Sequence, residues 1–423
     1  MKKEFERFDM TIPPRPTKWY LRPLTYLLSI TDVLKHRVVI RKTGTENLKP
    51  PYLLLCNHNA FLDFKVATIA IFPARANYVV AIDGFIGREK LLRDVGCICK
   101  RKFTNDVLLI RHLMRTIKNG DIAVIYPEAR YSLCGTTAVP PESLGAFCKL
   151  LRVPVVTLIC HGHHVNSPFW NPGDRGVRPI EAEFTLQYDS EQLKSATADE
   201  INRKLVKAFE YDDYRWQKEK GIRVDCKKRA EGLHKVLYQC PACGKEYKMS
   251  SSGTQIYCNN CGKRWTMTPL GELCADEGET EFSHIPDWYE WQRANVRREI
   301  EAGTYSSGPL PVRVDTLPNA KKFIRLGYGT MVRDMTGFHV SGIDVDGDDF
   351  EMEKSVPSLY SCHIEYNYLG KHGDCVDLNT LEDTWYIYPY DCEFSVTKMA
   401  LATEELYFAH RRKSGKPCKP GLA

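Results

Sequence analysis

The sequence lacks a long hydrophobic run. No stretch reaches the roughly 18 consecutive apolar residues that a membrane-spanning helix requires, which argues against an integral membrane protein. The first residues, MKKEFERFDM, also lack the apolar core of a signal peptide. Internal repeats and low-complexity segments are missing as well. The absence of spanning and export signals predicts a protein that stays in the cytoplasm.

The composition is that of a folded chain with more than one domain. Its 423 residues exceed the usual ~100 to 200 of a single domain, so two or three domains are expected. The 16 cysteines would indicate disulfides in a secreted chain, but without an export signal they are better explained as thiols or metal ligands. The net charge of +6, with basic clusters such as LKHRVVIRK and KRKF, suits anionic lipid head groups and nucleic acid equally well.

Residues 1–45 are interpreted as an N-terminal segment that contacts a membrane surface. Between Trp19 and Leu34 aromatic and aliphatic residues follow approximately helical spacing, with basic residues around them. A helix that packs on its own domain is the alternative. The choice depends on whether the substrate is a lipid.

Residues 46–210 form the first predicted domain, an α/β fold with a mixed sheet flanked by helices. Short apolar runs, YLLLC, YVVAI, IAVIY and VPVVTLI, alternate with helical segments such as 106–118 and 142–152. This alternation is typical of βαβ units with buried strands. A charged helical tract at 199–220 leads into a helical linker at 211–236.

The second half of the chain is predicted to hold two further domains. A small zinc ribbon is expected at 237–268, around two pairs of cysteines. After it, short strand-like runs such as GYGTMVRD, GFHVSGIDV, LYSCHIEYNY and DTWYIYPY precede one amphipathic helix at 394–412. This order of elements predicts a β-rich domain at 285–415 of the PH-like or GRAM-like type.

The strongest chemical signal is CNHNAFLDF, which directly follows an apolar run. His58 and Asp63 would point in different directions on a regular helix, so a turn is expected between them, and Asn57 and Asn59 suit it. An imidazole can remove a proton from a hydroxyl, while a carboxylate on its other nitrogen fixes the tautomer. His58 is therefore the candidate general base and Asp63 its orienting partner. A histidine that only caps a loop is the alternative.

The order of motifs over residues 50–168 resembles the glycerolipid acyltransferase family of the lysophosphatidate acyltransferase type. Its first motif, H-x4-D, is matched by His58 and Asp63. Its second motif, used to bind the glycerol phosphate, has an arginine six positions after a glycine; in VGCICKRKF, Arg101 stands one position early and Lys102 at the expected place. The resemblance implies that either cation neutralises a phosphate. A solvated basic turn is the alternative.

The third motif of that family, F-P-E-G-T-R-S, appears as YPEARYS. Glu128 is in register, and the resemblance implies that it orients the hydroxyls of the acceptor. Arg130 stands one position early and would assist phosphate recognition through its bidentate fork, unless it forms only a surface ion pair. Ala129 replaces the glycine of the motif. The displaced arginine leaves the identity of the acceptor open.

Two weaker signals follow. VPVV, at Val153 and Pro154, matches the fourth family motif, a hydrophobic residue before proline, but the same pattern describes many buried strands. In HGHH, His161, His163 and His164 are possible metal ligands, but no matching ligand set is evident and a loop is expected.

The cysteine pairs CPACG and CNNCG contain Cys240, Cys243, Cys258 and Cys261. Two C-x2-C knuckles, each followed by glycine, supply four thiolates for a tetrahedral site, so a structural zinc ion is expected. Two disulfides or a redox dithiol fit the spacing and the compartment less well. Nearby basic and aromatic residues would also suit nucleic acid, but stapling a small fold is favoured.

The resemblance implies an acyltransferase that moves a fatty acyl group from acyl-CoA or acyl-carrier protein to 1-acylglycerol 3-phosphate, without a catalytic cofactor. The insolubility of that lysophospholipid predicts peripheral association with the inner face of the cell membrane. Two alternatives stay open. One is an acyltransferase for another lysolipid or polar acceptor, and the other is an inactive acyltransferase fold that binds nucleic acid through the ribbon, a partner that we consider unlikely.

Overall fold

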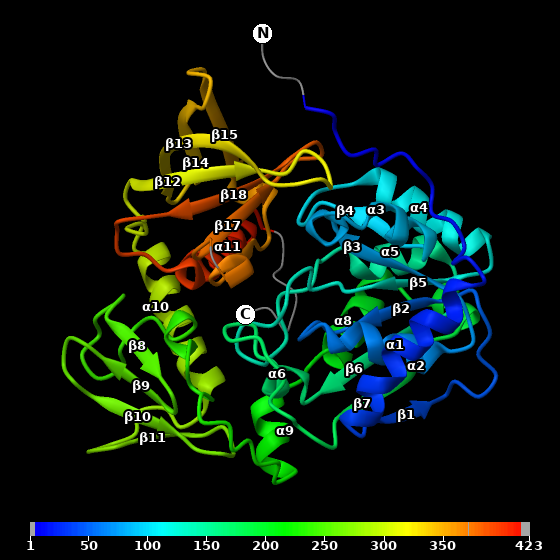
Figure 1. Ribbon diagram of the computed structural model, residues 1–423, viewed down its shortest axis with the longest axis horizontal. Helices are drawn as coiled ribbons and strands as arrows, with labels where there is room; N and C mark the ends of the chain where they lie inside the picture. Colours follow the sequence, from blue (N-terminus) through cyan, green and yellow to red (C-terminus); the bar gives the residue numbers. More distant parts are fainter. Residues whose placement is uncertain (1–4, 371, 416–423) are drawn as a thin grey trace.

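The computed structural model describes residues 5–370 and 372–415 of the chain. The first domain is built on a seven-stranded sheet with the order β1-β7-β6-β2-β5-β3-β4 (Figure 1). Neighbouring strands are parallel except β6 and β7, which pair antiparallel. The mixed sheet confirms the predicted α/β class. Its strands are β1 (Val39–Thr43), β2 (Leu53–Cys56), β3 (Ala76–Ala81), β4 (Ile98–Lys100), β5 (Ile122–Ile125), β6 (Val155–His161) and β7 (Glu181–Tyr188).

Helices pack on both faces of this sheet. In β2, Leu54 faces a core shared with Val66 of α2, whereas Leu55 faces a second core shared with Leu205 of α8. Burial on both faces explains why these strands appear in the sequence as continuous apolar runs. The helices are α1 (Leu21–Lys35), α2 (Leu62–Ile71), α3 (Glu89–Asp94), α4 (Val107–Lys118), α5 (Leu144–Leu151), α6 (His163–Asn166), α7 (Ser190–Ser195), α8 (Ala198–Ala208) and α9 (Asp213–Glu219).

The charged tract expected at 199–220 is not one helix. Helix α8 ends at Ala208, before the buried Phe209, and α9 starts after Asp212, whose extended backbone has a φ of −146°. The Asp212 side chain accepts a hydrogen bond from the backbone amide of Arg215, as an N-cap does. Local capping therefore divides a tract that the charge pattern predicted as continuous.

The cysteine-containing segment forms a small antiparallel sheet with the order β11-β10-β9-β8. The sheet extends past the predicted ribbon boundary at 268 because β11 pairs with β10. Trp265 of β10 packs against Trp288 of the long helix α10 (Ile285–Glu301), with ring centroids 5.0 Å apart. The strands are β8 (Met249–Ser252), β9 (Gln255–Cys258), β10 (Arg264–Met267) and β11 (Leu273–Ala275).

The C-terminal region contains a second seven-stranded sheet, antiparallel throughout, with the order β15-β14-β13-β12-β18-β17-β16. The sheet curls, with β15 and β16 at its two edges (Figure 1). A β-rich C-terminal half is thus confirmed, and its PH-like or GRAM-like identity stays a prediction. The strands are β12 (Leu310–Thr316), β13 (Ile324–Arg333), β14 (Gly337–Asp344), β15 (Asp349–Ser355), β16 (His363–Glu365), β17 (Cys375–Asn379) and β18 (Thr384–Pro389).

The final helix, α11 (Val396–Lys413), contacts both the C-terminal sheet and the first domain. It packs against α10 and β16, and most of its residues are buried, including Glu404 and Glu405. The expected amphipathic helix is present, but charged residues lie on its buried side as well as on its exposed side. The loop after β5 of the first domain contacts this helix through an ion pair of Arg130 with Glu404. Among the described helices, none combines the length and apolar character needed to cross a bilayer.

Candidate active site

His58 and Asp63 lie on opposite sides of the turn that joins β2 to α2. The strand ends before His58, and the helix begins one residue before Asp63, as their spacing requires. His58 Nδ1 lies 3.3 Å from Asp63 Oδ2. The same oxygen accepts hydrogen bonds from the backbone amides of Asn59 and Ala60, at 2.6 and 3.0 Å. The turn therefore fixes the carboxylate at the imidazole.

The two asparagines beside His58 hold this turn in place. The Asn57 side chain donates to the carbonyl of Cys160 at 2.9 Å and accepts from its amide at 2.8 Å, which ties the turn to β6. Asn59 Oδ1 accepts a hydrogen bond of 2.9 Å from the hydroxyl of Tyr211. The loop that carries His58 is thus anchored on both sides of the imidazole.

Asp63 is completely buried yet ionised. Burial by itself raises the pKa of this carboxyl, but hydrogen bonds from His163 and His58 outweigh it and bring the pKa down to about 2. An ionised Asp63 keeps the proton of His58 on Nδ1. The Nε2 atom of His58 is then free to accept a proton.

His163 is a site residue that the sequence reasoning missed. HGHH is not a loop, since His163 and His164 begin α6. His163 is fully buried, and its Nδ1 contacts Asp63 Oδ1, the carboxylate oxygen opposite to the one that faces His58. Cys160 lies close enough to complete a metal-ligand trio with these two residues, and in the structure Asp63 and His163 contact each other directly. The only sequence signal for this role of His163 was its position just after a buried strand.

Two tyrosines from the loop after β5 flank the candidate base. The ring centroids of Tyr126 and Tyr131 lie 4.3 and 4.2 Å from that of His58. The backbone amide of Ser132 donates to the His58 carbonyl at 2.8 Å. Only 24% of the His58 side chain is exposed. The YPEARYS segment therefore wraps around the His58 turn, as two motifs of one site would.

Glu128 lies in this loop and is fully buried. Burial raises the pKa of its carboxyl well above the ordinary value, against the opposing influence of the Ala138 amide and the Arg130 guanidinium. The next residue, Ala129, has a φ of +56°, in the left-handed region that favours glycine. The loop thus keeps a glycine-like conformation at the position where the related motif has glycine.

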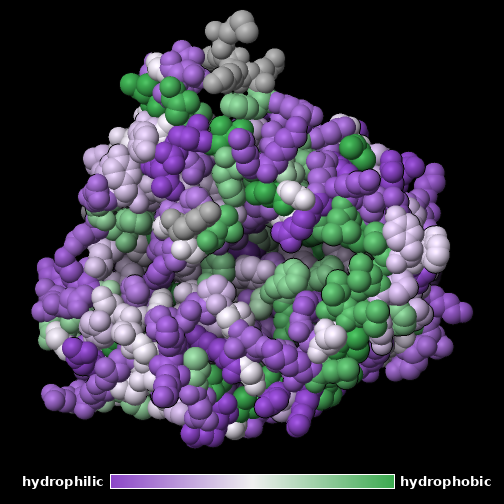
Figure 2. Space-filling view, in the orientation of Figure 1, coloured by the Kyte–Doolittle hydropathy of each residue, from purple (hydrophilic) through white to green (hydrophobic). Residues whose placement is uncertain are grey.

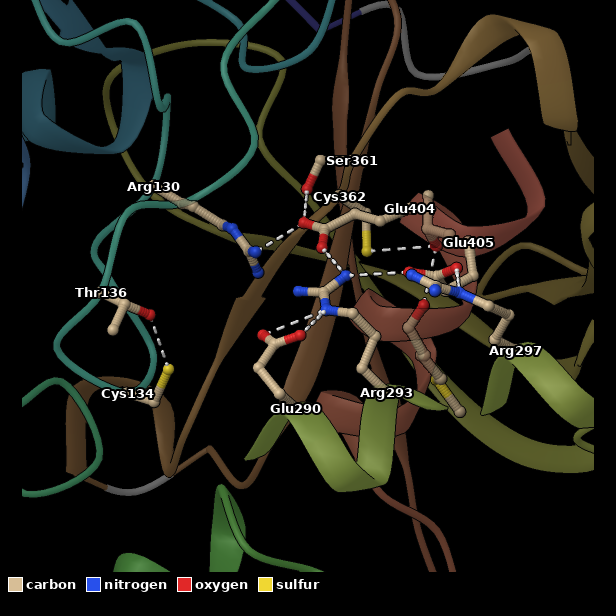
Figure 3. A network of polar contacts seen from close by, with 12 residues as sticks. Arg130, Cys134, Thr136, Glu290, Arg293, Arg297, Ser361, Cys362, Glu404 and Glu405 are labelled. Carbon is tan, nitrogen blue, oxygen red and sulfur yellow. Dashed lines mark hydrogen bonds and ion pairs between the residues drawn. The ribbon is translucent and has the colours of Figure 1, made fainter. Parts of the chain in front are cut away.

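Arg130 points from this loop to the C-terminal domain (Figure 3). Its Nη2 lies 2.6 Å from Glu404 Oε1 on α11, and both side chains are buried. Arg130 was expected to assist phosphate recognition. In the structure its partner is a carboxylate of the same chain.

Arg101 and Lys102 follow β4 and likewise contact the C-terminal domain. Arg101 is buried and donates to the carbonyls of Leu317 and Pro318, at 3.0 and 3.1 Å. Lys102 Nζ lies near the carboxylates of Asp83 and Asp377. The structure therefore brings His58, Asp63 and Glu128 into one region, whereas the three cations are engaged at the boundary with the C-terminal domain.

The four cysteines of the two knuckles converge on one point. Their sulfur atoms all lie within 4.8 Å of one another. The Sγ atoms of Cys240 and Cys261, and those of Cys243 and Cys258, are 3.8 Å apart. A tetrahedral zinc site with metal–sulfur bonds of about 2.3 Å has an edge of about 3.8 Å, so the four thiols fit the ion in number, type and spacing.

Comparison with known proteins gives one family and one described structure. The Acyltransferase family model matches residues 39–161, which contain β1 to β6 and the His58 and Glu128 motifs. A crystal structure of the 1-acyl-sn-glycerophosphate (LPA) acyltransferase PlsC from Thermotoga maritima is similar at 14% identity and a TM-score of 0.35, over 45% of this chain and 77% of that one. The search of curated proteins returned no match.

Proposed function

Because residues 39–161 form a domain of the Acyltransferase family, we propose that the chain transfers a fatty acyl group from acyl-CoA or acyl-carrier protein to a hydroxyl of a lysoglycerolipid. The observation that carries this proposal is the contact of His58 Nδ1 with the buried, ionised Asp63. The sequence motifs make 1-acylglycerol 3-phosphate the first acceptor to test. The alternative acceptor is another lysolipid. It is considered because Arg101, Lys102 and Arg130 already have partners in the same chain.

The proposed reaction needs no covalent enzyme intermediate. His58 Nε2 takes the proton from the acceptor hydroxyl as its oxygen attacks the thioester carbonyl carbon. Asp63 stabilises the imidazolium that forms. The carbon–sulfur bond then breaks, and the imidazolium returns the proton to the leaving thiolate. The products are the new ester and a free thiol, and Glu128 is assigned to positioning the acceptor.

We propose that α1 contacts the membrane in which such substrates reside. Large apolar side chains of α1 face outward, since Leu27 is 58% and Leu28 59% exposed, and Trp19, just before the helix, is 81% exposed. Figure 2 shows hydrophobic surface on the side of the molecule where α1 lies in Figure 1. The apolar surface suits peripheral binding to the inner face of the cell membrane.

We also propose that Cys240, Cys243, Cys258 and Cys261 bind a zinc ion that staples the small sheet β8–β11. A nucleic-acid role is less well supported, because two of the basic side chains near the knuckles already have carboxylate partners. Lys248 contacts Glu393, and Lys263 contacts Glu281. The bound ion would supply folding free energy that this small sheet cannot gain from its own core.

The experiment that tests the proposed function is thioester-dependent acylation of a panel of lysolipids by the purified protein. It is run beside His58→Ala with matched zinc content and melting temperature. Activity that this substitution abolishes supports the proposal. Activity that persists in His58→Ala removes the mechanism, and a complete absence of acylation with both kinds of donor removes the function.

A further inference from the structure

Glu404 cancels the charge of Arg130 inside the protein. The Glu404 side chain is fully buried, and it also accepts hydrogen bonds of 2.8 Å from Ser361 Oγ and from Arg293 Nη1 (Figure 3). Burial by itself raises the pKa of Glu404, but the guanidinium groups of Arg130 and Arg293 outweigh it and lower the pKa. Glu404 is therefore ionised where an external anion would otherwise meet Arg130.

The charges around this pair are balanced. Arg293 also contacts Glu405 at 3.4 Å and Glu290 at 3.1 Å, and Arg297 contacts Glu405 at 2.7 Å. Together with the ion pair of Arg130 and Glu404, the cluster contains three guanidinium groups and three carboxylates. A phosphate dianion at this place would add negative charge that no group in the cluster neutralises, and burying such charge is costly.

Lys102 is neutralised by a separate set of carboxylates. Its Nζ lies 3.8 Å from Asp83 of the first domain and 3.6 Å from Asp377 of β17. Burial lowers the pKa of the adjacent His363 to about 3, so this imidazole adds no positive charge at neutral pH. Glu365 also faces Lys102, although burial raises its pKa to about 8. Burial also raises the pKa of Asp377, whereas Lys102 helps to lower that of Asp83. Lys102 is therefore already neutralised by carboxylates of the same chain.

A row of aromatic rings leads from the candidate base to these carboxylates. Tyr131, whose ring contacts that of His58, lies 5.7 Å from Phe169 between ring centroids. Phe169 in turn contacts Tyr366 at 5.4 Å and His363 at 6.4 Å. At the end of this row, His363 and Tyr366 form an aromatic wall of the C-terminal domain, and the buried Asp377 lies beside His363.

We propose that the acceptor carries no phosphate monoester and presents an uncharged or ammonium-bearing head group to this wall. The inference rests on the proposed acyltransferase function and specifies the acceptor class for the same site. Glu404 beside Arg130, and Asp83 with Asp377 beside Lys102, take the places at which an acceptor phosphate would meet these cations. Rejection of the dianion then follows from like-charge repulsion, which selects against wrong ligands at many interfaces.

The test compares two acceptors that differ only in the phosphate: 1-acylglycerol and 1-acylglycerol 3-phosphate with the same acyl chain. The 1-acyl ester of 3-amino-1,2-propanediol, an amino diol that replaces the 3-hydroxyl of 1-acylglycerol by an ammonium group, serves as the ammonium-bearing arm. The full-length protein is expected to show a kcat/KM at least about tenfold higher for 1-acylglycerol or the amino diol than for the phosphate. Equal or higher kcat/KM for the phosphate overturns this inference and leaves the acyltransferase proposal intact. No acylation of any of these acceptors overturns both.

Two isosteric substitutions test whether the carboxylates set this preference. Glu404→Gln keeps one acceptor oxygen, for Ser361 and Arg130 or for Arg293, but removes the charge. Asp377→Asn likewise removes a carboxylate charge beside Lys102. In each variant the kcat/KM for the phosphate acceptor is expected to rise relative to that for the uncharged one. If Glu404→Gln fails to fold, Asp377→Asn remains informative because its partner Lys102 keeps Asp83. An unchanged ratio in the folded variants would show that these residues do not determine the acceptor.

Discussion

His163 Nδ1 contacts Asp63 Oδ1, so the carboxylate that orients His58 is itself held by a second, fully buried imidazole. Asp63 thereby bridges two histidines, one partly exposed and one without access to solvent. Misplacement of a catalytic group by about 1 Å can cost about 100-fold in rate. The contact therefore gives His163 a positioning role for the proposed base.

His163→Leu is expected to lower kcat/KM for acyl transfer by about 10- to 100-fold, because Asp63 loses the hydrogen bond that fixes it. His163→Asn places an amide NH2 near the former Nδ1 and should recover part of the loss in kcat without changing KM. His161→Leu is the matched control, since that ring stacks on Trp216 and does not contact Asp63. Equal activity of His163→Leu and the parent would refute the positioning role.

Asp63 should also make folding stability depend on acid pH. Its folded pKa of about 2 lies below the ordinary value of 3.8, so its contribution is complete above the unfolded pKa and is lost as the pH falls through the folded pKa. The contribution is about 2 kcal/mol. Asp63→Asn should therefore be less stable than the parent at neutral pH, with a difference that narrows between about pH 4 and pH 2. Denaturant unfolding at several pH values measures this difference, and Asp225→Asn, in an exposed ion pair, should show almost none.

The local part of the site could be predicted from the sequence, whereas its long-range contacts could not. The strand, turn and helix around His58 and Asp63 depend on a few adjacent residues, and so do the cysteine knuckles. By contrast, His163 is 100 residues from Asp63, and Glu404 is 274 residues from Arg130. A single sequence shows that Arg130 is present but not which carboxylate meets it. For the same reason the sequence predicted α11 only as an amphipathic helix and did not show that Glu404 and Glu405 lie inside the protein.

Ala129→Gly is expected to stabilise the protein. An L-residue at a φ of +56° is strained by roughly 1–2 kcal/mol, and glycine removes this strain while increasing the entropy of the unfolded chain. The net gain should be about 0.5–1 kcal/mol in the free energy of unfolding. Ala294→Gly, at an exposed position within α10, should instead cost about 1 kcal/mol. A destabilised Ala129→Gly would show that the side chain of Ala129 contributes packing that outweighs the strain.

Removal of zinc should unfold the sheet β8–β11 and weaken its contact with α10. Cys261→Ser removes one of the four thiols and should abolish stoichiometric zinc, measured by elemental analysis, and lower the melting temperature. Binding of zinc to such sites contributes on the order of 10 kcal/mol to folding. Cys274→Ser is the control, because Cys274 is exposed like Cys261 but lies outside the cluster. If Cys261→Ser retains a full equivalent of zinc and the parent's melting temperature, the cysteines do not form the proposed site.

Charged residues on α1 should weaken binding to lipid vesicles. Leu28 is 59% exposed, and burial of a leucine side chain in the bilayer interface contributes about 1.5–3 kcal/mol. Leu28→Glu is therefore expected to reduce co-sedimentation with vesicles of anionic phospholipid by about tenfold or more, without a change in melting temperature. Leu381→Glu is the matched control, because Leu381 is also 59% exposed but lies in the C-terminal domain. Equal binding by Leu28→Glu and the parent would place the membrane contact elsewhere on the molecule. An equal loss of binding in both variants would have a different cause. It would show that the added negative charge weakens binding to the anionic surface, and that the lost apolar contact at α1 does not.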